Sequence, residues 1–187
     1  MLLTLSLATS LVAFQDAGFP GAEARSEMAR LSALSGNWTA AIETMQGDGN
    51  WELAGEELVS IRYLLGGLAL REDPAEHPIN VFRLESTIQY DQNRDIYRLV
   101  AMDDTWGNMD IYEGGWTEAN VLSLTNLRSD TSFENADGSS LHFRLTTRIE
   151  GPDSHVFQVD MSQDHGDSWR PYQRITRTRY GIENSPQ

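Results

Sequence analysis

The stretch LHFRLTTRIE, residues 141–150, decides the fold class of this 187-residue chain. Apolar and polar residues alternate along it: the apolar set is Leu141, Phe143, Leu145 and Ile149, and the polar set is His142, Arg144, Arg148 and Glu150. Residues 155–163 repeat the pattern with Phe157, Val159 and Met161. Successive side chains of a strand point to opposite faces, so each stretch has one buried and one wet face. The pattern therefore predicts an antiparallel sheet.

Turn signals divide the rest of the chain after Gly36 into similar strands. The expected strands are residues 36–44, 56–64, 68–71, 81–90, 96–102, 108–112, 121–127, 140–150, 155–163 and 169–180. Gly66–Gly67 is expected to bend or bulge a strand, and Gly114–Gly115 to form a turn. About nine or ten strands joined by short turns favour an all-β, antiparallel up-and-down β-barrel, since an open sheet would leave long edges exposed. A barrel of this size has room for a small-molecule cavity.

One helix is expected before the strands. Apolar residues recur at helical spacing from Ala22 to Leu34, and Gly36 stands just past the last of them, where a helix C-terminus favours glycine. This helix is short and has one apolar face. We therefore expect a single N-terminal helix that packs against the barrel.

The N-terminus resembles a secretory signal, because Leu2–Phe14 is an apolar segment too short to span a bilayer. Its start lacks Lys and Arg, and the small-residue cleavage pattern near Ala13 or Ala17 is poor. We expect a periplasmic or secreted protein: residues 1–21 form a signal peptide and short linker, 22–182 a single domain and 183–187 a tail. The alternative is a buried N-terminal segment.

Composition limits the classes of partner that the protein is expected to bind. The net charge is −14, and all 14 basic residues are Arg. Such a field repels phosphate backbones, so nucleic acid is not an expected partner. There is no cysteine, which excludes disulfides, thiolate metal sites and cysteine nucleophiles. No stretch approaches the roughly 20 apolar residues of a membrane span, so stable membrane insertion is not expected.

Several short motifs in order carry a resemblance to a known family. They are Leu34–Trp38 (LSGNW), Ser60–Gly67 (SIRYLLGG), Tyr90–Asp91 followed by Tyr97, and Ile175–Arg179 (ITRTR). Over residues 28–180 the chain resembles the bacterial family of unknown function DUF1579, although Arg177 stands where an aromatic residue is commoner. The resemblance implies a lipocalin-like or fatty-acid-binding-protein-like β-barrel. It implies no catalytic residues.

Arginines on the expected strands are the first candidate ligand contacts. Arg177 and Arg179 are two apart on the closing strand, so their side chains leave the same face. If that face lines a cavity, the two form a cationic anchor for a carboxylate or phosphate. Arg62, in the strand that ends at Gly66–Gly67, is a similar candidate. The alternative is a solvated strand face balanced by nearby Asp and Glu.

Aromatic residues near strand ends are the second group of candidates. Trp106 and Trp116 are expected to line the cavity mouth and stack on a ligand, with Trp51, Trp169 and Tyr112 as further members of the set. The alternative is ordinary core packing and cover for the rim.

Metal, cofactor and catalytic patterns are weak. Asp103, Asp104 and Asp110 do not match a calcium loop, and Asp favours turns. The four histidines form no zinc-like pair in the sequence, and a lone His155 or His165 is a weak haem ligand candidate. No G-x-S-x-G motif occurs. We therefore expect no metal, no cofactor and no catalytic residue.

These patterns favour an exported protein that holds a small, largely apolar ligand, or an amphipathic anion, in a barrel cavity. The alternatives are an enzyme of the isomerase or hydrolase type acting on an apolar substrate in the same barrel, and a ligand-free interaction domain. A buried carboxylate or His with a perturbed pKa facing the cavity would favour the enzyme. A barrel filled by its own side chains would favour the interaction domain.

Overall fold

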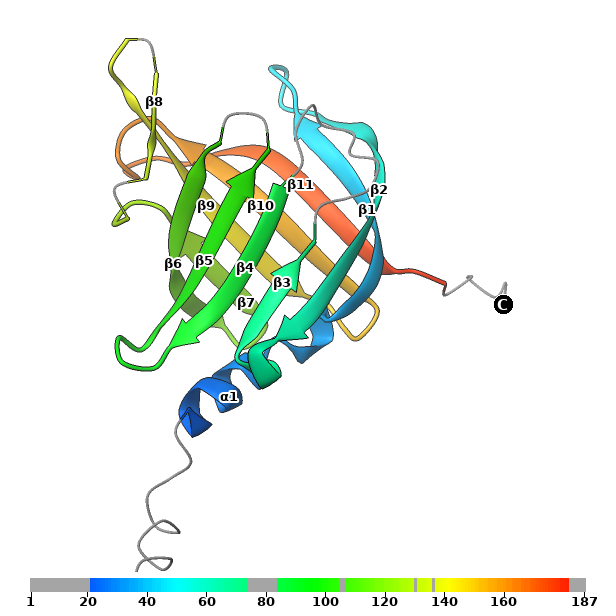
Figure 1. Cartoon of the computed structure of the whole chain (residues 1–187). Coiled ribbons are helices and arrows are strands. Elements are labelled where there is room, and N and C mark those ends of the chain that lie inside the picture. The colour runs from blue at the N-terminus through cyan, green and yellow to red at the C-terminus, as the bar shows by residue number, and fades with distance from the viewer. Residues whose placement is uncertain (1–20, 74–83, 105–106, 130, 136, 182–187) are drawn as a thin grey trace, which may run out of the picture.

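Antiparallel strands form a closed ring in the computed structural model, which describes residues 21–73, 84–104, 107–129, 131–135 and 137–181 (Figure 1). The strands are β1 Gly36–Met45, β2 Trp51–Leu64, β3 Ala69–Glu72, β4 Leu84–Asp91, β5 Ile96–Asp103, β6 Met109–Glu118, β7 Val121–Thr125, β8 Phe133–Glu134, β9 Ser140–Ile149, β10 Ser154–Ser162 and β11 Arg170–Arg179. Ten of them follow one another around the ring, which closes where β10 pairs with β9. The expected antiparallel β-barrel is confirmed.

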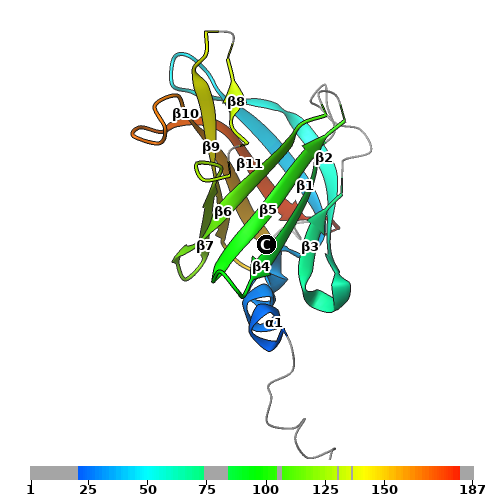
Figure 2. The ribbon, with the colours of Figure 1, turned by 60° about the vertical axis from the view of Figure 1, so that its left-hand side comes forward.

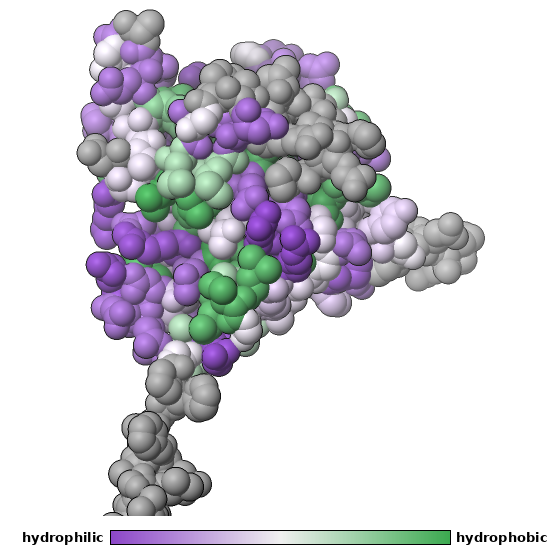
Figure 3. Space-filling model, viewed as in Figure 1, coloured by the Kyte–Doolittle hydropathy of each residue, from purple (hydrophilic) through white to green (hydrophobic). Residues whose placement is uncertain are grey.

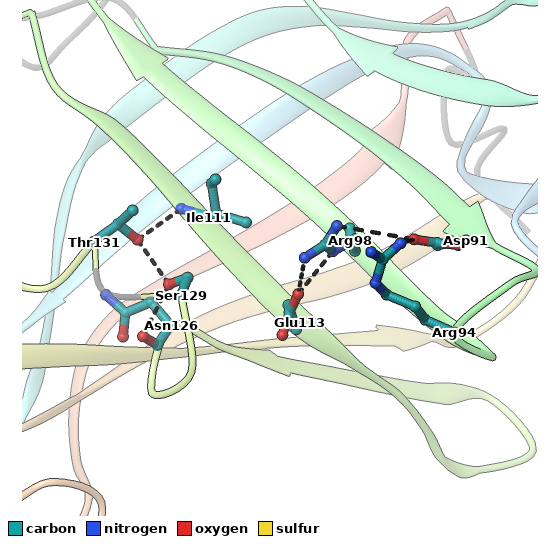
Figure 4. Close-up of polar contacts among 8 residues, drawn as sticks. All are labelled: Asp91, Arg94, Arg98, Ile111, Glu113, Asn126, Ser129 and Thr131. Carbon is teal, nitrogen blue, oxygen red and sulfur yellow. Dashed lines mark hydrogen bonds and ion pairs between the residues drawn. The ribbon is translucent and has the colours of Figure 1, made fainter.

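Strand β8 lies outside the ring and was not expected from the sequence. Among the described residues it pairs with the start of β9 alone, through Phe133 opposite Leu141. The chain between β7 and β8 is held on β6, since the Ile111 amide donates to Thr131 Oγ1 (3.0 Å) and Thr131 lies 2.7 Å from Ser129 Oγ (Figure 4).

Alternation places the inward residues as the sequence predicts. Phe143 and Leu145 of β9 line the interior, and Val159 of β10 lies opposite Leu145 in the same layer. The outer face carries ion pairs instead. Arg98 of β5 donates from Nε to Glu113 of β6 (2.7 Å), on the outside of the barrel wall (Figure 4).

Helix α1, Ala22–Ala29, and a 3₁₀ turn, η1 Ser32–Leu34, close one end of the barrel (Figures 1 and 2). The expected continuous helix to Leu34 is therefore wrong in its C-terminal part. Met28 and Leu31 are fully buried at this end. Three aromatic side chains from the strands donate to carbonyls of this segment: Tyr97 to Glu27, Tyr63 to Met28 and Trp38 to Leu34, at 2.9, 2.6 and 2.9 Å. The Glu27 and Met28 carbonyls also accept from the amides of Arg30 and Leu31, so the aromatic side chains add a second bond there and fix the segment to the strands.

Two glycine pairs behave differently from the sequence prediction. The turn expected at Gly114–Gly115 is wrong, because both residues lie inside β6. Glycine is required at 114 by close packing, since a Cβ there would lie 2.1 Å from the Ser123 carbonyl oxygen of β7. Gly66 and Gly67 belong to the turn Leu65–Gly67 that joins β2 to β3, and both have positive φ. They end a strand rather than bulge one.

The surface is mostly hydrophilic on the face shown in Figure 3, with hydrophobic residues gathered in separate patches. Exposed apolar side chains include Leu65 in the β2–β3 turn, which is 71% exposed. Within the described ranges, no helix is long and apolar enough to cross a bilayer.

Candidate functional site

The barrel encloses a cavity of about 310 Å³. This is near the lower limit of ligand pockets, which occupy about 300–1,000 Å³. Its apolar wall comprises Leu34, Ile42, Val59, Ile61, Leu70, Ile88, Leu99, Ala101, Leu122, Leu124, Phe143, Leu145, Phe157, Val159 and Ile175. Leu84 and Tyr172 also line it and are 48% and 44% exposed, so the cavity reaches solvent at the end opposite α1. The arrangement suits a small, mainly apolar molecule.

One buried ion pair joins two strands of the cavity wall that are not neighbours. Arg177 of β11 donates from Nη2 to Glu72 Oε1 of β3 (2.5 Å), although β1 and β2 lie between these strands. Ala40 of β1 lies opposite Arg177 in the register, and its small side chain leaves the guanidinium room to cross. The Arg177 side chain is 6% exposed and that of Glu72 is 25% exposed. Because its charge is balanced by Glu72, Arg177 is not a free cation.

His155 of β10 lies beside this pair. It is opposite Arg177 in the register, 1% exposed, and its ring packs edge-on against Trp38 with centroids 4.4 Å apart. Neither ring nitrogen has a hydrogen-bond partner among the described residues, and neither does Arg177 Nε. Burial, and then the nearby Arg177 and Arg179 cations, lower the pKa of His155 to about 3. The imidazole is therefore neutral near pH 7, with one donor and one acceptor.

Further carboxylates face the cavity nearer its mouth. Asp110 of β6 is 4% exposed and accepts hydrogen bonds from Asn126 Nδ2 (3.0 Å) and Thr131 Oγ1 (2.5 Å). Burial and the neighbouring Asp110 raise the pKa of Tyr112, which keeps this phenol protonated. Glu57, Asp73 and Asp103 also line the cavity. With Glu72 the lining therefore holds five carboxylates, of which Glu72 is paired with Arg177 and Asp73 with Arg62 and Arg71.

Of the two arginines expected to act together, only Arg177 lines the cavity. They do share the inward face, opposite Ala40 and Trp38 of β1. Arg179 lies at the closed end, where it donates to the carbonyls of Pro152 (2.6 Å) and Ser35 (3.2 Å), with its Cζ 4.3 Å from the Trp38 ring centroid.

The backbone conformation at position 36 favours glycine. Gly36 has φ +148°, and a Cβ there would lie 2.2 Å from the Arg179 guanidinium. The close approach of these two residues seals the barrel next to η1.

Two of the other predicted contacts, Arg62 and Trp116, lie away from the cavity wall. Arg62 is on the outer face of β2, pairs with Asp73 and has a side chain 54% exposed. Trp116 lies at the closed end, where its Nε1 donates to the Tyr97 hydroxyl (2.9 Å) and Arg30 stacks over its ring. Trp106 lies outside the described residues.

Two polar cavity residues were not predicted as ligand contacts. His155 was considered only as a weak haem ligand, yet its spacing of two from Phe157 already places it on the inward face. Glu72 gives no such signal, because its partner Arg177 is 105 residues away in the sequence.

Metal ligation finds little support in these residues. Across the described ranges, no group of three or more His, Asp or Glu side chains is placed to hold an ion. His142 and His165 do come together, but their ring nitrogens Nε2 and Nδ1 share a hydrogen bond of 3.0 Å. Burial and the His165 charge lower the pKa of His142.

Comparison with known proteins assigns the chain to one family of undescribed function. Residues 23–179 match a family model described as "Protein of unknown function (DUF1579)". No curated protein matches the chain.

Proposed function

Because the chain belongs to the DUF1579 family, whose description assigns no function, we propose from the cavity itself that the protein binds a small, largely apolar molecule inside its barrel. The observation that carries the proposal is the cavity of about 310 Å³ with a mainly apolar wall and an opening at one end. Well-packed cores contain few voids larger than a water molecule. An interior left this open therefore fits a binding protein better than a filled interaction domain.

A fluorescence titration with N-phenyl-1-naphthylamine, an uncharged apolar probe, tests the proposal. We expect saturable binding at one site in the unaltered protein. Ala101 faces the cavity, so Ala101→Trp should fill the space and abolish binding. Val100 precedes Ala101 in β5 and therefore faces outward. The matched control is Val100→Trp, and this variant should bind the probe normally.

Two results would contradict the proposal. One is the absence of saturable binding to the unaltered protein. The other is equal binding to all three proteins, which would place the probe on the outer surface. If the unaltered protein binds the probe inside the barrel, native mass spectrometry of protein purified from its own host would identify the natural ligand.

An enzyme acting on an apolar substrate is the second candidate, and one observation favours it. His155 faces the cavity with a perturbed pKa, and such groups concentrate at active sites. We rank binding first, because general-base catalysis works best with a pKa near the working pH, and that of His155 is about 3. Turnover of an apolar ester that is lost in His155→Phe would reverse this ranking.

We also propose export to the periplasm or the medium, on the basis of the apolar segment Leu2–Phe14, which lies outside the described residues. The intact mass of the protein recovered from the periplasm or medium should lack this segment. A cytoplasmic protein that retains Met1 would contradict the proposal.

A further inference from the structure

The polar side chains of the cavity define which end group its ligand carries, given that the cavity binds an apolar molecule as proposed above. His155 is the strongest indication. Its ring is 1% exposed, lines the cavity and has two nitrogens without a partner among the described residues. A buried polar group without a partner is costly, so a ligand group that bonds to it gains affinity.

Arg177 is the obvious alternative anchor, but its charge is already balanced. Its Nη2 is bonded to Glu72, and its buried Nε lacks a partner among the residues described. A ligand carboxylate would have to displace Glu72 or lie beside it. Either arrangement leaves a buried carboxylate without full compensation, which is costly.

The acidic lining elsewhere in the cavity also disfavours an anionic ligand. Asp110 is nearly fully buried and lines the same cavity. Like charges placed together in a binding site disfavour association strongly. The lining therefore disfavours an anion at the mouth as well as beside Arg177.

We propose that the natural ligand is an uncharged amphiphile, with a hydroxyl or carboxamide group that hydrogen-bonds to His155 and an apolar body that fills the cavity. Such a group both donates and accepts, which matches the one donor and one acceptor of a neutral imidazole. The Nε of Arg177 offers a second donor next to it. Glu72 determines the specificity, because it occupies the guanidinium that would otherwise bind an anion.

Competition against N-phenyl-1-naphthylamine at about pH 8, where carboxylates are fully ionised, tests this proposal with three probes of equal chain length: decanol, decanamide and decanoate. We expect decanol and decanamide to bind the unaltered protein at least about tenfold more tightly than decanoate. Equal or tighter binding of decanoate would overturn the proposal and leave the proposed function standing. Failure of the fluorescent probe and all three competitors to bind would overturn both.

Glu72→Gln tests the specificity step. It frees the guanidinium of Arg177, so decanoate should bind at least about tenfold more tightly, while decanol changes less than about threefold. The matched control is Glu113→Gln, since Glu113 is also paired with an arginine, Arg98, but on the outer face (Figure 4). It should change neither affinity. Unchanged decanoate binding in Glu72→Gln would overturn the role given to Glu72.

His155 is tested by two substitutions. His155→Phe removes the hydrogen bond and should weaken decanol by about threefold to tenfold, whereas His155→Gln restores a donor and an acceptor and should weaken it less. Equal decanol affinity in the unaltered protein and both variants would overturn the contact. If His155→Phe does not fold, the comparison of decanol with decanoate and the Glu72→Gln result still decide the proposal.

Discussion

The two ends of the barrel use the same kinds of residue for different purposes. At the end closed by α1, the polar atoms of Trp38, Tyr63 and Tyr97 each donate to a carbonyl of the helical segment. In the cavity, both ring nitrogens of His155 and Nε of Arg177 have no partner in the part of the chain that the structure describes. Buried polar groups that are fully paired stabilise a fold, whereas unpaired groups beside an empty space are placed to bind something else.

We therefore treat the closed end as a structural plug and the half of the barrel that holds the cavity as the proposed binding site. We define the plug as α1, η1 and the side chains of Trp38, Tyr63, Tyr97 and Trp116 that pack on them. Substitutions in the plug should lower the free energy of unfolding. Substitutions that face the cavity should mainly change ligand affinity.

The largest effect is expected for Trp38→Ala in the plug. Trp38 is 0% exposed and bonded to the Leu34 carbonyl, so its removal leaves a large cavity and an unpaired acceptor. The free energy of unfolding should fall by about 3–5 kcal/mol, measured by urea denaturation. A loss below about 1 kcal/mol, as for an ordinary surface site, would show that the plug does not stabilise the barrel.

Tyr97→Phe should have the next largest effect. The Tyr97 hydroxyl donates to the Glu27 carbonyl and accepts from Trp116 Nε1, so its loss leaves the Trp116 N–H unpaired and removes one of the two bonds that the Glu27 carbonyl accepts. We expect a loss of about 1–3 kcal/mol. Tyr172→Phe at the exposed cavity mouth is the matched control and should change stability by about 0.5 kcal/mol or less. Equal effects of the two substitutions would remove the distinction between the two ends.

The pH dependence of stability should report on His155. Its pKa is about 3 in the folded state and about 6.5 in an unfolded chain, so the unfolded state binds more protons between these values. Stability contributed by the neutral imidazole is therefore fully present above about pH 6.5 and is lost as the pH falls towards about 3.

Between about pH 7 and pH 5 this loss should be about 2 kcal/mol in the unaltered protein. Urea denaturation at each pH measures it, and the loss should be smaller by that amount in His155→Phe. His142, whose pKa is also lowered, contributes equally to both proteins and cancels in the difference. Identical pH profiles would mean that His155 is not buried in its neutral form.

The smallest effect is expected for Arg62→Gln. Arg62 forms an ion pair with Asp73, as Arg177 does with Glu72, but its side chain is 54% exposed. Exposed ion pairs contribute about 0–1 kcal/mol, so the change in stability should be about 0.5 kcal/mol or less, and decanol affinity should stay the same. A clear loss of affinity would place Arg62 back among the ligand contacts.

The barrel could be predicted because its signal is local. Alternation over residues 141–161 fixes which face of β9 and β10 points inward, and that decision needs no knowledge of the rest of the chain. The interruption at Gly114–Gly115 was misread for a physical reason. Glycine serves both turns and close backbone contacts, and only the neighbouring strand β7 shows that the second applies here.

The candidate site could be predicted only in part. Arg177 was found from its spacing on β11, but its pairing with Glu72 connects strands that are not neighbours. The plug was foreseen as one packed helix, whereas the aromatic side chains that bond to it come from three separate strands. A cavity is what remains after all side chains are packed, so no local pattern predicts its volume.

We propose that the cavity binds an uncharged amphiphile at His155. Nitrogen NMR of protein labelled with ¹⁵N only in its four histidines, titrated with decanol, tests this most directly. His155→Phe identifies the His155 signals by their loss. We expect the His155 ring nitrogens to shift in a saturable way while those of His142 and His165 stay unchanged. Saturable shifts at His142 and His165 with none at His155, or no shift at all, would contradict it.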